Sequence, residues 1–180
     1  MTEKELQRMA DENICYEIKM LITAEGLLNE LQLIMRPGQG YLLITLMNAR
    51  LESFLIHARN FMEFFYPTKS SKDQPNSVLA IHYLSNWENL DAIKDKKPKT
   101  FSKYHNKIHQ RLAHISLERL EGEKTRWLCK EILTDVLKVW KIFLTELSKE
   151  SQEKRKWFEC WDDFIQNLPE DKKKLLEATP

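Results

Sequence analysis

The chain has 180 residues, enough for one domain with a hydrophobic core, and we expect a single helical domain over 1–180 with a frayed tail at 168–180. Its 28 basic and 27 acidic residues leave a formal net charge of +1, which excludes a global field that would draw the protein to nucleic acid or to an anionic membrane. Charged residues make up 31% and hydrophobic residues 42%, as in soluble globular proteins, and only 4 glycines and 6 prolines interrupt the chain.

The first two predicted helices cover residues 2–35 and 41–66. In 2–35 apolar residues recur at steps of three, four and seven, and Thr2 followed by Glu5 indicates an N-terminal capping box. The helix over 41–66 is apolar around much of its circumference, so we expect it to lie at the centre of the fold. The turn RPGQG at 36–40 makes the two helices antiparallel neighbours.

Further helices are predicted at 77–87, 101–121, 123–149 and 153–167. Gly122 is the expected C-cap of the third long helix, and so short a link makes 101–121 and 123–149 antiparallel neighbours. No segment has the alternating pattern of a strand. We therefore predict an all-α fold, an antiparallel four-helix bundle with an extra short helix in the connection between the second and third long helices. The C-terminal helix is expected to pack outside the bundle.

The cysteines predict unpaired thiols in a reducing compartment. Cys15, Cys129 and Cys160 are scattered along the chain, in neither a disulfide framework nor a zinc spacing, and no neighbour activates them. The polar start of the chain lacks a secretory signal, and the longest apolar runs are far too short to span a bilayer. We expect a cytoplasmic protein with no membrane partner.

Three of the five histidines lie between residues 103 and 120. At a helical period His105 and His109 fall on or beside the apolar arc of helix 101–121, whereas His114 points the other way. The i, i+4 spacing of His105 and His109 can hold one metal ion, but this helix supplies at most two ligands. Because no HExxH or Glu-x-x-His motif accompanies them, they are weak metal candidates, and we predict neither a metal nor a cofactor.

A matching polar line follows helix 41–66 and suggests a contact between the two helices. If this line faces helix 101–121, the sequence predicts a buried polar network of Glu52, Arg59, His109 and Arg119, in which Arg59 also has Glu63 at i+4. The favoured interpretation is a structural network; the alternative is a metal or small-ligand pocket at His105, His109, Glu52 and Glu63. The line consists of Thr45, Asn48, Glu52, Arg59 and Glu63. A separate patch on another side of the helix consists of Arg50, Ser53, His57 and Asn60.

Two segments resemble a known family. RLESFLIHARNFMEFFY at 50–66 and RLAHISLERL at 111–120 are similar to the paired helices E-[SA]-F-x-x-H-x-R and A-H-[LI]-[ST]-x-x-R of small uncharacterised bacterial proteins. HYLSNW at 82–87 also fits, and the resemblance covers about residues 41–127. It implies an all-helical fold. The matching positions are Glu52, Phe54, His57, Arg59, Ala113, His114, Ser116 and Arg119.

A weaker resemblance is to HEPN domains, helical bundles that often act as dimeric ribonucleases. Their signature is an arginine, four to six residues and a histidine, whereas here only two residues separate Arg111 from His114, which departs from the motif. The resemblance implies a metal-independent endoribonuclease of toxin or RNA-processing type. His114 would be the general base, with Arg111 and Arg119 on the scissile phosphate.

Three functions stay open after the sequence alone. The favoured one is a non-catalytic protein that acts by association with itself, as a possible dimer, or with another protein. The alternatives are the HEPN-like ribonuclease and the metal or small-ligand pocket. Nucleic acid is not favoured as a partner, because the lysine run KDKKPK at 94–99 has no interleaved aromatic platform.

Overall fold

The structure, a computed structural model, describes residues 1–34, 40–94, 96–113, 126–168, 170 and 173. Within these ranges all regular structure is helical and no strand occurs, which confirms the all-α prediction. In the same ranges no helix is both long enough and apolar enough to cross a membrane.

The first helical segment is continuous from residue 3 to residue 34. It consists of α1 (Glu3–Arg8), a π-helical turn η1 (Met9–Ile14) and α2 (Cys15–Ile34). The predicted capping box is confirmed: the Thr2 hydroxyl accepts from the Glu5 N–H at 3.3 Å, and the Thr2 N–H donates to the Glu5 carboxylate at 2.7 Å.

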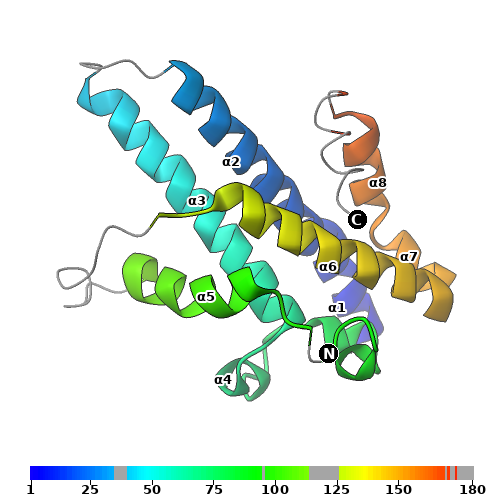
Figure 1. Ribbon diagram of the computed structural model, residues 1–180. Helices are drawn as coiled ribbons and strands as arrows, with labels where there is room; N and C mark the ends of the chain where they lie inside the picture. Colours follow the sequence, from blue (N-terminus) through cyan, green and yellow to red (C-terminus); the bar gives the residue numbers. More distant parts are fainter. Residues whose placement is uncertain (35–39, 95, 114–125, 169, 171–172, 174–180) are drawn as a thin grey trace.

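Three long helices pack against one another. α3 (Tyr41–Phe65) runs antiparallel beside α2, and α6 (Cys129–Glu150) packs across both of them (Figure 1). α5 (Lys99–Ile108), continued by the π-helical turn η4 (His109–Ala113), packs against α3 and α6. This arrangement brings the C-terminal half of α3 into contact with α5.

The connection between α3 and α5 differs from the prediction. It holds one short helix, α4 (Lys69–Lys72), and two 3-10 turns, η2 (Ala80–His82) and η3 (Trp87–Asn89), so the helix predicted at 77–87 is wrong. Hydrogen bonds to other parts of the fold hold this segment in place. Trp87 Nε1 donates to the Phe65 carbonyl at 2.9 Å, and the Tyr83 hydroxyl donates to the Leu6 carbonyl at 2.9 Å. The apolar spacing that suggests a helix here reflects burial against the long helices.

Several helix boundaries also differ. The third long helix begins at Lys99 and is described as far as Ala113, whereas Gly122, its expected C-cap, lies outside the described residues. The helix predicted from residue 123 begins at Cys129. The predicted helix 153–167 is divided into α7 (Gln152–Lys156) and α8 (Glu159–Gln166).

Aromatic side chains form the centre of the core. Trp140 and Phe143 of α6 stack with ring centroids 5.6 Å apart, and Phe61 of α3 lies 5.8 Å from Trp140. The C-terminal helices lie at the edge of the long helices in Figure 1, yet Phe158 and Trp161 contact Trp140 and are buried. The C-terminal helix, which was expected to pack outside the bundle, therefore contributes aromatic side chains to the core.

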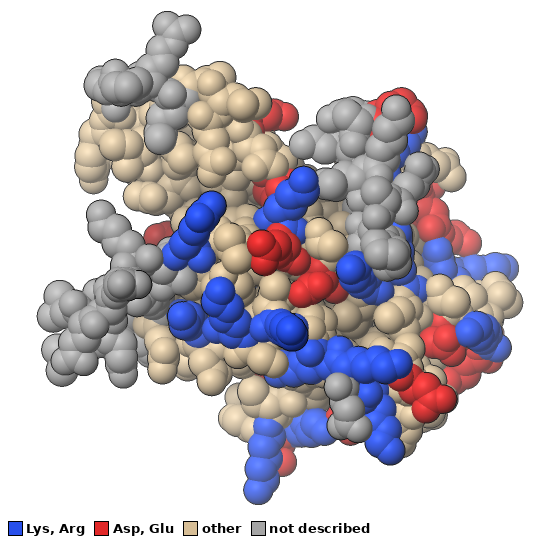
Figure 2. Space-filling model, viewed as in Figure 1, with Lys and Arg blue, Asp and Glu red and all other residues tan. Residues whose placement is uncertain are grey.

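The N-terminal half of α3 protrudes from this core, together with the end of α2. This surface, which we name the hairpin end, corrects the expectation that the whole of helix 41–66 is central. Its large apolar side chains are 42% to 86% exposed. Figure 2 shows it at the upper left as an almost uncharged region, while a band of basic side chains crosses the middle of the same face. The hairpin end consists of Leu33, Ile34, Tyr41, Leu42, Ile44 and Leu46.

Candidate functional site

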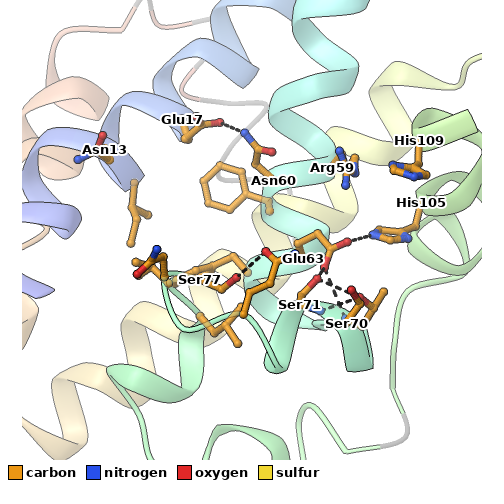
Figure 3. Close-up of a pocket in the computed structure, with 18 of the residues that line it drawn as sticks. Asn13, Glu17, Arg59, Asn60, Glu63, Ser70, Ser71, Ser77, His105 and His109 are labelled. Atoms are coloured by element: carbon orange, nitrogen blue, oxygen red, sulfur yellow. Dashed lines mark hydrogen bonds and ion pairs between the residues drawn. The ribbon is translucent and has the colours of Figure 1, made fainter. Parts of the chain in front are cut away.

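A pocket lies where four segments meet: η1 with the start of α2, the C-terminal half of α3, the loop around α4, and α5 with η4 (Figure 3). Its volume is about 650 Å³, within the usual range for small-molecule sites. Polar side chains line much of it. The polar lining includes Asn13, Glu17, Arg59, Asn60, Glu63, Ser70, Ser71, Ser77, His105 and His109.

Glu63 is at the centre of a hydrogen-bond cluster in this pocket. Its Oε1 accepts from His105 Nε2 at 2.6 Å, which joins α3 to α5. Its Oε2 accepts from the Ser71 hydroxyl and from the Thr68 N–H, the latter at 3.5 Å. Thr68 also caps α4, because its hydroxyl accepts from the Ser71 N–H at 3.2 Å. The Glu63 carboxylate thus links α3 to α5 and to the segment that contains α4.

The environment keeps Glu63 ionised. Burial by itself raises the pKa of this carboxyl group, but several groups outweigh it: the Ser71 hydrogen bond, the charge and hydrogen bond of His105, and the Thr68 N–H. The net result is a pKa below the ordinary value of 4.5. Such a group is a strong hydrogen-bond acceptor and a weak general base at neutral pH.

The order of this cluster is not that of a catalytic triad. Glu63 stands between Ser71 and His105, so the imidazole that would have to take the serine proton is bonded to the carboxylate instead. A nucleophilic serine needs its base in direct contact. The cluster fits a role in holding α3, α4 and α5 in place.

A second carboxylate cluster joins α2 to α3. Glu17 Oε2 lies 2.7 Å from His57 Nδ1 and accepts from Asn60 Nδ2 at 2.9 Å. His57 is buried, and its ring meets Tyr16 edge to face. Glu17 and Asn60 are on the pocket wall, so both acidic residues of the wall already have a histidine partner.

Arg59 lines the same pocket, but its charged group is not paired as Glu17 and Glu63 are. It lies one turn before Glu63 on α3, but the Glu63 carboxylate is bonded to His105, so the predicted i, i+4 pair does not form. Its Nε is buried and has no hydrogen-bond partner, and none of the ion pairs among the described residues includes it. A guanidinium group is always charged, so Arg59 carries a positive charge without a direct ion-pair partner among the described residues.

The structure brings together only part of the predicted buried network. Arg59 and His109 line the same pocket, as do His105 and Glu63. Glu52 is exposed, against the prediction of burial, because it lies on the half of α3 nearer the hairpin end. His109 is also exposed rather than buried.

The remaining predicted site residues are not placed by the structure. His114 and Arg119 lie outside the described residues, and the Arg111 side chain is not described. The HEPN-like arrangement thus stays a prediction. Among the residues that are described, no group of three or more His, Cys, Asp or Glu side chains is arranged to hold a metal ion.

Sequence reasoning missed the residues supplied by other segments. Glu17 lies on a helix that was predicted from its apolar spacing. Thr68 and Ser71 lie between the helices predicted at 41–66 and 77–87. The one available signal was Thr68 before KSSK, which is a helix N-cap pattern. No sequence spacing relates these residues to Glu63 or His57.

The cysteines require a further correction. Cys15 and Cys160 form a disulfide with Cα atoms 6.4 Å apart, so these two are not unpaired thiols. Residues 145 positions apart are brought together because α8 packs on α2. Cys129 is free; burial, with a contribution from the charge of Glu25, raises the pKa of its thiol to about 11, which agrees with the expectation that it is inert.

Comparison of the chain with family models, with curated proteins and with solved structures finds no match. The pocket and the hairpin end are therefore the features from which a function is inferred.

Proposed function

We propose that this protein functions without catalysis, by association with a second copy of itself through the hairpin end. The observation that carries the proposal is the exposure of the large apolar side chains at 33–34 and 41–46. Monomeric soluble proteins rarely leave a contiguous apolar surface of this kind uncovered, and such surfaces mark interaction sites.

The chemistry of the surface favours a second copy over a charged partner. The described residues of this region, 31–34 and 40–49, include no acidic and no basic side chain. A surface whose described side chains are all uncharged offers no charge complementarity to a basic or acidic partner, whereas two identical apolar surfaces complement each other about a two-fold axis.

The position of the surface supports the same inference. The hairpin end protrudes beyond α5 and α6 in Figure 1, so these two helices leave it open to a second hairpin. Its side chains come from both α2 and α3, which allows two hairpins to pack helix against helix.

At the level of the fold, we infer that the segments 3–34, 41–65, 99–113 and 129–150 make an antiparallel four-helix bundle. The antiparallel α2 and α3, and the packing of α5 on both α3 and α6, support this inference. The bundle would leave the hairpin end as its unpaired extremity.

The test is the mass of the protein in solution, by light scattering on a sizing column over a range of concentrations. We expect a dimer, and we expect Leu42→Lys to raise its dissociation constant at least tenfold, because one lost leucine contact is worth about 1.5–3 kcal/mol. The matched control is Ile56→Lys on the same helix: Ile56 is 49% exposed but lies outside the hairpin end, so this variant should remain dimeric.

Three results would overturn the proposal. They are a monomeric mass at every concentration, a dimer unaffected by Leu42→Lys, and a monomer that binds neutral phosphatidylcholine vesicles through the same side chain. The last would assign the hairpin end to a membrane surface.

A further inference from the structure

We propose that the pocket between α3 and α5 binds a small organic anion, with Arg59 as the group that recognises its carboxylate or phosphate. This inference is independent of self-association through the hairpin end. It starts from the charges on the pocket wall.

The acidic side chains of the wall already have hydrogen-bond partners. Glu17 is held by His57 at 2.7 Å and by Asn60 at 2.9 Å. Glu63 is held by His105 at 2.6 Å and by the Ser71 hydroxyl. Among the described residues, neither carboxylate accepts a hydrogen bond from Arg59 or forms an ion pair with it.

Arg59 supplies a positive charge that has no direct ion-pair partner among the described residues. Its Nε is buried without a hydrogen-bond partner among the described residues, which is a costly state for a charged group. In Figure 3 the Arg59 side chain lies toward the α5 side of the pocket, near His109. A carboxylate or a phosphate bound there would accept from the guanidinium fork, the geometry for which arginine is suited.

The rest of the lining defines the kind of molecule. Apolar side chains form one part of the wall, among them Phe61, Phe64 and Val78, and neutral polar groups form another, among them Ser70 and Ser77. A volume of about 650 Å³ holds a molecule of metabolite size. The ligand class is thus a compact organic acid or phosphate ester with an apolar portion, and an isolated metal ion does not fit these groups.

The test uses three probes that share one ring: benzoate, phenyl phosphate and neutral benzamide. Binding to the purified full chain is followed by calorimetry and by the NMR shifts of the His105 and His109 ring protons. We expect at least one of the two anions to bind and to shift both rings, and we expect benzamide to do neither. Comparing benzoate with phenyl phosphate tells a carboxylate site from a phosphate site.

Substitutions test whether Arg59 provides the charge that binds the anion. Arg59→Gln should weaken anion binding about tenfold or more, the usual loss for one charge-assisted hydrogen bond, and Arg59→Lys should restore part of it. Arg50→Gln, on the same helix but off the pocket wall, should leave binding unchanged.

Several results would contradict the proposal. One of them comes from the NMR titration of the wild type, so the test does not depend on whether Arg59→Gln folds. The proposal is wrong if neither anion binds at millimolar concentration, or if benzamide binds as well as benzoate. It is also wrong if folded Arg59→Gln binds the anions like the wild type.

Discussion

At the scale of single residues, the pocket wall shows how one ionised side chain organises its surroundings. Glu63 accepts from His105, Ser71 and Thr68, which come from α5, α4 and the loop before α4. These bonds lower its pKa although burial opposes the change. A group whose pKa is lower in the folded state adds stability above its ordinary pKa of 4.5, and this contribution is lost as the pH falls through the folded-state value.

Glu63→Gln tests this linkage. At pH 7 we expect the free energy of unfolding to fall by about 1–3 kcal/mol, because the charged acceptor of His105 and Ser71 is replaced by a neutral one. Urea titrations between pH 7 and pH 3 should also show a smaller loss of stability on acidification in the variant than in the wild type.

The control for this substitution is Glu52→Gln, an exposed acidic residue on the same helix. It should change the free energy of unfolding by less than about 0.5 kcal/mol. Equal effects of the two substitutions, or identical pH profiles of wild type and Glu63→Gln, would contradict the role assigned to Glu63.

At the scale of elements, the C-terminal helices are held to the rest of the fold in two ways. Phe158 and Trp161 pack on Trp140 of α6, and the disulfide between Cys15 and Cys160 joins the start of α2 to α8. The disulfide links residues 145 positions apart, so it removes a large part of the freedom of the unfolded chain. Disulfides are typical of oxidising compartments.

Peptide mapping under non-reducing conditions should recover a peptide pair linked through Cys15 and Cys160, with Cys129 as the alkylated thiol. Reduction should lower the free energy of unfolding by about 2–4 kcal/mol, the usual contribution of a disulfide. Cys160→Ser should be as unstable as the reduced protein and indifferent to reductant. Full alkylation of all three cysteines in the native, unreduced protein would show that the bond does not form.

At the scale of the whole molecule, the two proposed functions use opposite ends of one helix. Leu42 lies in the hairpin end and Arg59 lies in the pocket, 17 residues further along α3, which is about 25 Å at 1.5 Å per residue. The buried residues of α3 all lie between Phe54 and Phe65, on the pocket side, whereas the hairpin end extends away from this core. We expect sites so far apart to act independently.

The double variant Leu42→Lys with Arg59→Gln tests this independence. Leu42→Lys should change the dimer dissociation constant without changing anion affinity, and Arg59→Gln should do the reverse. The free energies measured for the double variant should equal the sum of the single effects to within about 0.5 kcal/mol. A larger departure would mean that the pocket and the hairpin end are coupled through α3.

The sequence by itself determined the helical class and the places of the long helices. Apolar residues at helical spacing and scarce glycine and proline carry this information locally, as does the Thr2 and Glu5 capping box. The sequence also offered the hypothesis that the polar line on α3 faces the histidine-bearing helix 101–121, and the contact between Glu63 and His105 agrees with it at one end of the line.

Only the tertiary structure decided which residues share a site. Glu17 with His57, Ser71 with Glu63, and Cys15 with Cys160 meet because of how helices pack, and no local spacing encodes these pairs. The exposure of Glu52 was also decided by tertiary packing. The helical period predicts which face of a helix is buried, but it does not predict the length of the helix over which neighbouring elements cover that face. That length depends on how far α5 and α6 extend along α3, which is a property of the assembled molecule.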